Sequence, residues 1–291
     1  GDLKAANEFK ADGVGLYRTE FPFLVRSNFP SEEEQFLIYQ KLLEGMPGKQ
    51  VTFRTLDIGG DKILSFYDYG KEENPFLGLR SIRFSLKHKD VFIQQLRAIL
   101  RAGHGYDVRI MFPMISSVDE FQEAKGMVQE CIHCLTAQKL PCHETPQLGT
   151  MIELPSVLDI IDELAQEADF FSIGTNDLIQ YLLAIDRTNE KVADYYLPHH
   201  PSVIRALKKI IDAGKAQRID VSICGDMAHE PKYLKLLLGL GLRHFSLDAR
   251  YLPKVHETIA SISVVEAQDL ALRILKESKI VRTAQLLDQT S

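Results

Sequence analysis

Short apolar runs alternate with longer helix-patterned segments along nearly the whole chain. The runs resemble buried strands and lie near residues 13–18, 51–57, 78–84, 108–113, 147–153, 169–174, 220–225 and 243–248. The segments between them are amphipathic or rich in Ala and Leu, and we expect helices at 31–45, 88–103, 117–139, 155–167, 201–217, 230–239, 251–261 and 264–278. Strands separated by helices pair in parallel, so the alternation predicts an α/β fold.

Eight such strand–helix units predict a single (β/α)8 TIM barrel with a C-terminal helical extension. A doubly wound open sheet has nearly the same periodicity, but the sequence lacks the G-x-G-x-x-G turn that often opens one. The unpatterned stretches 59–76 and 186–200 are candidate active-site loops. We predict one barrel domain at 13–291, preceded by the end of an interdomain linker helix at 1–12.

Composition narrows the class of partner. A net charge of −6 gives no basic field for a nucleic-acid backbone, so we expect no nucleic-acid partner. No apolar run reaches the roughly 18 residues of a membrane span, and the first residues lack a signal-peptide pattern, so we expect a cytoplasmic protein without a membrane partner. The start has no Met and reads as the middle of a helix, which suggests a fragment of a longer chain.

Two arginines lie within apolar, strand-like runs. Arg18 and Arg54 are costly to bury there unless each meets a negative charge. Their planar forks suit phosphate or carboxylate, so a shared anionic ligand is one interpretation. The alternative for either arginine is an internal salt bridge with Glu20 or Asp57.

Further arginines are weaker candidates. Arg80 and Arg83 would point to opposite faces of a strand, so only one can point inward, and we favour Arg80. Arg187 follows Asp177 in a loop and can swing over a ligand, although a solvated loop arginine is the more common outcome.

Glu153 and Asp177 follow two successive predicted strands. Oxygen ligands of this kind suit Mg2+ or Mn2+, which usually takes one or two carboxylates and completes its shell with water and substrate. A metal-free acid/base pair or ordinary helix caps are the alternatives. Cys224 ends another strand, where it is either a buried strand cysteine or a proton-transferring or nucleophilic thiol.

Three cysteines cluster in sequence. Cys131, Cys134 and Cys142, with His133 and His143, invite a metal interpretation. We instead expect Cys131 and Cys134 to share one face of a helix as small hydrophobic residues.

Taken together, several ordered motifs resemble one family. They are Gly15-Leu16-Tyr17-Arg18-Thr19-Glu20-Phe21, the segment 54–62, Glu73-Asn74-Pro75, Leu77-Gly78-Leu79-Arg80, Met111-Phe112-Pro113-Met114, Met151-Ile152-Glu153-Leu154-Pro155, Gly174-Thr175-Asn176-Asp177-Leu178, Asp186-Arg187 and Cys224-Gly225. From about residue 5 to about 275 the chain resembles the phosphoenolpyruvate-binding domain of enzyme I, the phosphoenolpyruvate-protein phosphotransferase of the bacterial sugar phosphotransferase system. Some segments are similar to its nitrogen-related branch.

The resemblance implies that six side chains bind phosphoenolpyruvate: Arg18, Arg54, Arg80, Asn176, Asp177 and Arg187. It also implies that Glu153 and Asp177 bind Mg2+ (or Mn2+), and that Cys224 protonates the enolate to give pyruvate. Two departures from the family pattern concern the last strands: Asp226 stands where Glu is usual, and Leu247-Asp248-Ala249-Arg250 replaces a run of small residues.

The resemblance implies partners as well. The phosphohistidine is expected on a separate N-terminal domain, since none of the nine histidines here lies in the family's Thr-Ser-His-Ala-like motif. A homodimer, a small phosphocarrier protein and a role in sugar transport are also implied, and the fragment alone is not expected to complete transfer. The alternatives are the corresponding domain of a pyruvate phosphate dikinase or phosphoenolpyruvate synthase, and a regulatory module that senses phosphoenolpyruvate or 2-oxoglutarate without turnover.

Overall fold

The computed structural model describes residues 2–289 and divides into two compact units. One unit is Asp12–Thr150; the other comprises the remaining described residues, 2–11 and 151–289. We call them the 12–150 unit and the 151–289 unit. Both contain parallel strands that pair in chain order and are joined by helices, which confirms the predicted α/β class.

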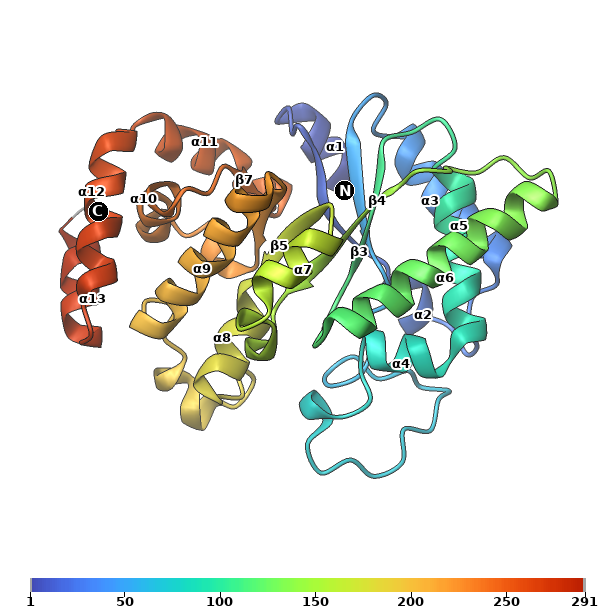
Figure 1. Cartoon of the computed structure of the whole chain (residues 1–291), viewed down its shortest axis with the longest axis horizontal. Helices are drawn as coiled ribbons and strands as arrows, with labels where there is room; N and C mark the ends of the chain where they lie inside the picture. The colour runs from blue at the N-terminus through green and yellow to red at the C-terminus, as the bar shows by residue number, and fades with distance from the viewer. Residues whose placement is uncertain (1, 290–291) are drawn as a thin grey trace. The chain divides into compact units, whose positions relative to one another are not determined.

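The 12–150 unit has four parallel strands. They are β1 (Gly13–Arg18), β2 (Gln50–Arg54), β3 (Val108–Phe112) and β4 (Gln147–Ile152), whose last two residues pass into the other unit. Three longer helices lie together on one side of these strands in Figure 1: α3 (Glu32–Glu44), α5 (Lys89–Ala102) and α6 (Val118–Ala137). Ser31 and Glu34 form a capping box that starts α3, and Ser117 accepts the Glu120 N–H at the start of α6.

A separate apolar cluster lies under the loop that follows β2. Leu56, Ile58, Leu64 and Phe84 are almost fully buried there, with several aromatic rings packed around them. Burial of this much apolar surface orders a segment that has no regular structure over 59–74 apart from one bridge between Gly59 and Lys62. The expected irregular stretch 59–76 is confirmed up to the short 3-10 helix η1 (Pro75–Leu77).

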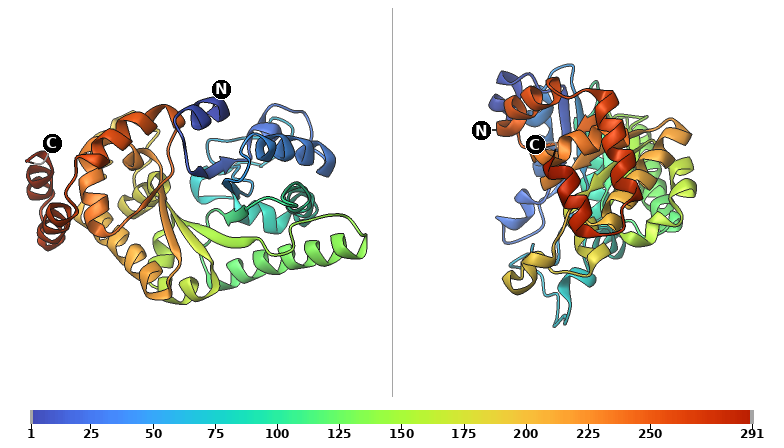
Figure 2. Two further views of the ribbon diagram at one scale, coloured as in Figure 1. Left: turned by 90° about the horizontal axis from the view of Figure 1, so that it is seen from above. Right: turned by 90° about the vertical axis from the view of Figure 1, so that its left-hand side faces the viewer.

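The 151–289 unit contains the later strands β5 (Phe170–Gly174), β6 (Asp220–Cys224) and β7 (His244–Phe245), which pair in parallel. Its remaining helices and 3-10 turns are α1 (Asp2–Glu8), η2 (Pro155–Leu158), α7 (Ile161–Glu167), α8 (Thr175–Leu183), η3 (Glu190–Tyr195), α9 (Pro201–Gln217), η4 (Asp226–Ala228), α10 (Pro231–Leu240), η5 (Ala249–Tyr251), α11 (Leu252–Ala260), α12 (Val264–Lys276) and α13 (Ile280–Asp288). In Figure 2, α12 and α13 lie side by side at the C-terminal end, and both pack against α10. They form the expected helical extension.

The predicted strand at 78–84 is wrong. Residues Ile82–Lys87 form helix α4, so residues 2–289 contain seven strands rather than eight. The Ser81 N–H donates to the Ile58 carbonyl at 2.9 Å, and Ser81 has a φ of 53°. Leu79 and Phe84 of this run therefore pack in the cluster under the loop instead of in a sheet, a use that the strand-like pattern does not reveal.

Four helices lie outside the predicted helical segments: α2 (Phe21–Leu24), α4, α8 and α13. Helix α8 begins at Thr175, directly after β5, and α13 follows the last predicted helix. The expected loop at 186–200 contains the 3-10 helix η3. No helix among residues 2–289 combines the length and apolar character needed to cross a membrane.

Candidate functional site

Arg54 ends β2 and lies among buried carboxylates in the 12–150 unit. Its Nη2 is 2.5 Å from Glu20 Oε1 and 3.1 Å from Asp57 Oδ2, and all three side chains are at most 7% exposed. The salt-bridge alternative for Arg54 is therefore confirmed. Thr19 donates to the Arg54 carbonyl at 2.9 Å, and Gln95 donates to Thr19 at 3.1 Å, so the backbone at this strand end is fixed as well.

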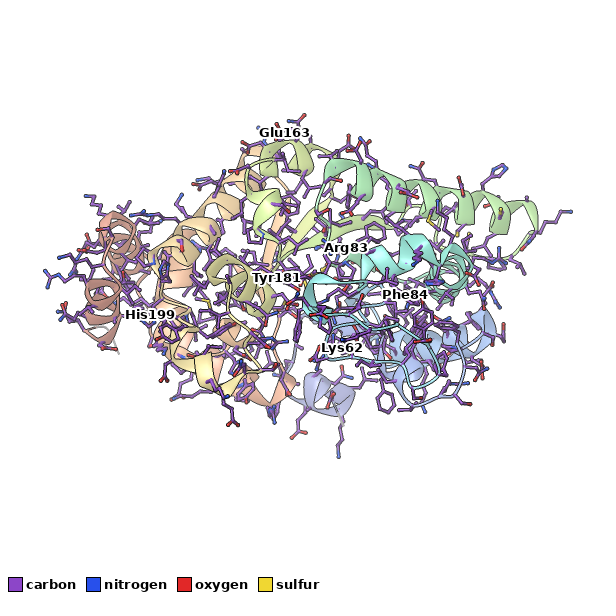
Figure 3. The ribbon with its side chains drawn as sticks, turned by 90° about the horizontal axis from the view of Figure 1, so that it is seen from below. Lys62, Arg83, Phe84, Glu163, Tyr181 and His199 are labelled. Carbon is purple, nitrogen blue, oxygen red and sulfur yellow. The ribbon has the colours of Figure 1, made fainter. Side chains whose placement is uncertain are left out.

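Asp57 is the centre of this group. Its carboxylate is 2.7 Å from Lys62 Nζ and 3.3 Å from Arg80 Nη2, and it accepts a hydrogen bond from the Ser81 hydroxyl. Burial by itself would raise the pKa of the Asp57 carboxyl, but Arg54, Lys62 and Arg80 outweigh it and hold the pKa well below its usual range. Asp57 is thus an anion at neutral pH and orients three cations, of which Lys62 is labelled in Figure 3.

We call Arg54, Lys62, Arg80, Glu20 and Asp57 the basic cluster. It contains three cations and two carboxylates, which makes it cation-rich. Of its members, Arg54 and Arg80 were predicted site residues. Arg83, by contrast, lies in α4 and donates to the Leu77 and Gly78 carbonyls, in agreement with the choice of Arg80 over Arg83.

Glycine allows the loop to return to the basic cluster. Gly59 has a φ of +98°, and a Cβ there would lie 2.5 Å from the Cβ of Arg80 and 2.8 Å from the Leu79 carbonyl oxygen. Only a residue without a side chain permits this approach. The Gly59-Gly60 turn therefore carries Lys62 to Asp57 and supports Arg80.

Two of the predicted arginines are exposed. Arg18 ends β1 opposite Arg54 in the strand register, but it is exposed, and none of the six residues of β1 is buried. Arg187 lies in the loop after α8, where its N–H donates to Gln180 Oε1 at 3.1 Å. Neither has a salt bridge with residues 2–289. The expectation of apolar surroundings for Arg18 is not met.

In the 151–289 unit, Glu153 follows β4 and Asp177 lies in the first turn of α8. Both are buried, with 2% and 8% of their surface exposed. A Cβ on Gly174 would lie 2.9 Å from Glu153 Oε2, so this carboxylate packs against the backbone that leads to Asp177. These two buried carboxylates have the hard oxygen donors that a divalent cation such as Mg2+ prefers.

No group of three or more His, Cys, Asp or Glu side chains suited to a metal occurs within residues 2–289. Any cation at Glu153 and Asp177 would take its other ligands from water or substrate. Cys131 and Cys134 lie in α6 as expected, and both are free thiols. Cys131 is buried but Cys134 is exposed, so the expectation that both pack as small hydrophobic residues holds only for Cys131. Burial raises the pKa of the Cys131 thiol to about 12, which makes it unreactive.

Cys224 ends β6 and is 4% exposed. Its thiol donates to the Ile173 carbonyl at 3.3 Å, and the Ser172 hydroxyl donates to its sulfur at 3.7 Å. Beyond it, the carboxamide oxygen of Asn176 accepts the Asp226 N–H at 3.0 Å. Asn176 and Cys224 therefore lie at neighbouring strand ends, and both are held by hydrogen bonds.

Tyr196 is a residue that sequence reasoning missed. Its hydroxyl donates to the Asn176 carbonyl at 3.3 Å, and burial raises the pKa of its phenol against the opposing effect of Arg187. A cavity of about 200 Å³ lies beside it, lined among others by Asn176, Asp226, Glu230, Lys232 and Tyr233. The only sequence signal for Tyr196 is its position in the candidate loop 186–200.

Known proteins resemble this chain in sequence. A family model described as "PEP-utilising enzyme, PEP-binding domain" matches residues 1–264. The chain is 44% identical over 288 residues to the phosphoenolpyruvate-protein phosphotransferase of Staphylococcus epidermidis, with 99% of this chain and 50% of that protein covered. For the protein of the same name from Staphylococcus aureus, the identity is 46% over 272 residues, covering 94% and 48%.

The chain therefore spans about half the length of the curated relatives it matches. Among solved structures, Haloferax volcanii malate synthase, determined as a pyruvate/acetyl-CoA ternary complex, has a TM-score of 0.50 at 11% identity, with 80% of this chain and 57% of that chain covered. This likeness concerns the fold alone. Because the family model covers most of the sequence, the chain belongs to the family of phosphoenolpyruvate-binding domains of PEP-utilising enzymes.

Proposed function

We propose that the chain binds phosphoenolpyruvate with Mg2+ and acts as the phosphoryl-donor part of a phosphoenolpyruvate-protein phosphotransferase, releasing pyruvate. The names of its relatives support the reaction. Since those relatives are about twice as long, the acceptor histidine is proposed to lie in a part of the parent protein outside these residues, with a small phosphocarrier protein as its partner. The nearest alternatives, a pyruvate phosphate dikinase or phosphoenolpyruvate synthase, have less support from these names.

The basic cluster is the observation that carries the proposal. Phosphoenolpyruvate has a phosphate and a carboxylate, and arginine forks bind both groups through paired hydrogen bonds. Arg54 and Arg80 are already buried and oriented by Asp57, so they lose little side-chain entropy when an anion arrives. Arg18, Asn176, Asp177 and Arg187 complete the proposed substrate-binding set.

Glu153 and Asp177 are the proposed ligands of Mg2+, or of Mn2+ in its place. When bound, the ion would stabilise the negative charge that develops on the enolate oxygen. The residues themselves supply two hard oxygen donors in a buried setting, which is the donor chemistry that such an ion prefers.

Cys224 is the proposed proton donor. When the phosphorus–oxygen bond of phosphoenolpyruvate breaks, the phosphoryl group passes to the acceptor histidine and an enolate remains. Its methylene carbon takes the thiol proton of Cys224, which gives pyruvate and leaves a thiolate. The Ser172 hydroxyl, 3.7 Å from the sulfur, can donate to that thiolate.

Calorimetry tests the binding proposal. Phosphoenolpyruvate should bind the wild-type chain in the presence of Mg2+, and Arg54→Ala should weaken that binding by at least about tenfold, because hydrogen bonds to charged groups contribute about 1.5–3 kcal/mol. Arg109→Ala is the matched control, since Arg109 lies on the next strand and donates to Gln147 away from the basic cluster. Binding that is independent of Mg2+, or unchanged in Arg54→Ala, would refute the proposal.

Proton exchange at the methyl group of pyruvate separates catalysis from sensing. A catalytic domain should exchange these protons slowly with solvent when Mg2+ is present, and Cys224→Ser should abolish the exchange. A regulatory module without turnover would show no exchange in either protein.

We further propose a cytoplasmic homodimer that serves sugar transport. Sedimentation of the chain tests the dimer directly.

A further inference from the structure

We propose that Thr175 is a positioning residue that sets the places of Cys224 and Asn176. It acts through the turn at residues 224–226, which joins the end of β6 to η4. The inference rests on the proposed function, because it assigns Thr175 to the same reaction. It concerns the first residue of α8, which is fully buried.

The Thr175 hydroxyl donates to the Cys224 carbonyl at 2.8 Å. The last paired residues of β5 and β6 are Gly174 and Cys224, so this side chain extends the bonding between the two strands by one residue. The chain turns into α8 at Thr175, and the hydroxyl thus makes a link at a point where the regular ladder has ended. It fixes the backbone of Cys224 at the residue that carries the thiol.

The same turn orients Asn176. Its carboxamide oxygen accepts the Asp226 N–H at 3.0 Å. A backbone N–H can only donate, so the atom facing it must be the oxygen, and the NH2 group is left to point elsewhere as a donor. A displaced turn would release this amide, which the proposed function uses to bind substrate.

Gly225 brings the turn into contact with both side chains. Its φ of 90° and ψ of −174° lie in a region open almost only to glycine. A Cβ there would lie 2.3 Å from the Thr175 hydroxyl oxygen and 2.6 Å from Asn176 Oδ1. The backbone at Gly225 therefore lies directly against the two side chains, and a change in Thr175 reaches the turn without an intermediary.

Three variants test the inference in the whole chain. Thr175→Val removes the hydroxyl at nearly constant volume, whereas Thr175→Ser keeps it. Thr283→Val is the matched control, because Thr283 is equally buried in α13 and its hydroxyl also donates to a backbone carbonyl, that of Lys279. Each protein is compared with wild type in its melting temperature and in the rate and KM of pyruvate proton exchange.

We expect Thr175→Val to lose about tenfold to a hundredfold in the exchange rate at saturating pyruvate, because small misplacements of reacting groups have effects of this size. Thr175→Ser should stay within about twofold of wild type, since it retains the donor. Thr283→Val should lower the melting temperature and leave exchange unchanged. Any of three results would overturn the inference. The exchange rate could be equal in Thr175→Val and wild type, it could fall in Thr175→Ser as much as in Thr175→Val, or it could fall equally in Thr283→Val.

A second readout needs no turnover. In wild type and Thr175→Ser, the NMR signals of the Cys224 β-carbon and the Asn176 side-chain amide should coincide, whereas in Thr175→Val both should shift or broaden. If wild type shows no exchange but Thr175→Val moves these signals, the proposed function fails and the positioning role stands. If the signals do not move, the positioning role fails whatever the exchange rates are.

Discussion

The carboxylate of Glu153 lies so close to Gly174 that a Cβ on the glycine would be 2.9 Å from Glu153 Oε2 and 2.9 Å from the Met151 sulfur. Glu153 Oε2 ends a flexible side chain, but the sulfur and the Cγ of Met151, the latter also 2.9 Å away, lie within a buried side chain, so Gly174→Ala should cost about 1–3 kcal/mol of stability. The Glu153 carboxylate must also move, and the affinity for Mg2+ should fall by about tenfold or more, as for changes in residues that support a metal ligand.

Gly126→Ala is the control for that experiment. Gly126 lies in α6 with open space around the position of a Cβ, so alanine should raise the stability by up to about 1 kcal/mol and leave Mg2+ affinity unchanged. Titration with Mn2+ followed by electron paramagnetic resonance measures both variants. Unchanged affinity in Gly174→Ala would remove Glu153 from the metal site.

Metal and substrate should bind cooperatively. Glu153 and Asp177 are the two protein carboxylates proposed for the ion, and residues 2–289 hold no cluster of three or more such ligands. The ion should therefore bind more tightly when phosphoenolpyruvate adds its own oxygens, and the substrate should gain affinity from Mg2+ by the same factor. Mn2+ titrations with and without phosphoenolpyruvate measure the coupling. Equal metal affinity in both would show that the ion does not contact the substrate.

Asp57→Asn should destabilise the fold by about 3 kcal/mol at pH 7, because it leaves Arg54 and Arg80 buried without their shared anion. The pKa of this carboxyl is lowered in the folded state, so its stabilising effect is present above the unfolded pKa and is lost as the pH falls below it. Urea unfolding should therefore show a constant difference from wild type above about pH 5 that shrinks below about pH 4.

Asp159→Asn is the matched change on the surface. Asp159 pairs with Lys209 at 3.1 Å but is 93% exposed, so its loss should change stability by less than about 0.5 kcal/mol. A similar effect at both aspartates, or a difference for Asp57→Asn that does not depend on pH, would contradict a structural role for the basic cluster.

The sequence predicts much of the scaffold because strand and helix periods are local properties. β1 was expected at 13–18 and occurs at Gly13–Arg18, and α9 was expected at 201–217 and occurs at Pro201–Gln217. Their apolar residues recur at the period of the element that they form. The strand interpretation of residues 78–84 is wrong for the same reason: Phe84 is buried in the cluster under the loop after β2, Ile82 is buried in α4, and no local pattern distinguishes such burial from burial in a sheet.

The positions of Arg54 and Cys224 at strand ends were predictable, whereas the contacts around them were not. Arg54 and Cys224 stand out because a polar or reactive residue ends an apolar run. Thr175 and Tyr196 donate to the backbone carbonyls of Cys224 and Asn176, 49 and 20 positions away in the sequence, so their residue types alone carry no signal of these contacts. The exposure of Arg18 was also unpredictable, since it depends on how completely β1 is covered.

Gly59→Ala should weaken both the fold and the proposed substrate site. Gly59 has a positive φ, and its missing side chain makes room for the Cβ of Arg80 and the Leu79 carbonyl, at 2.5 and 2.8 Å from an added Cβ. The atoms that would clash belong to or adjoin the backbone, so they cannot swing away as a flexible side chain would. We expect a stability loss above about 2 kcal/mol, from the strained backbone together with overpacking. Phosphoenolpyruvate affinity should fall as well, because Arg80 moves.

Gly48→Ala separates the cost of backbone strain from the cost of overpacking. Gly48 has a similar positive φ of +69° but nothing within 4 Å of an added Cβ, so alanine there should cost only the backbone strain of about 1 kcal/mol. It should leave phosphoenolpyruvate binding unchanged, because Gly48 lies between α3 and β2, before the strand that carries Arg54. Denaturant unfolding and calorimetry on the two variants compare them directly. If Gly59→Ala costs no more than Gly48→Ala, the close approach of the loop to Arg80 does not fix that arginine.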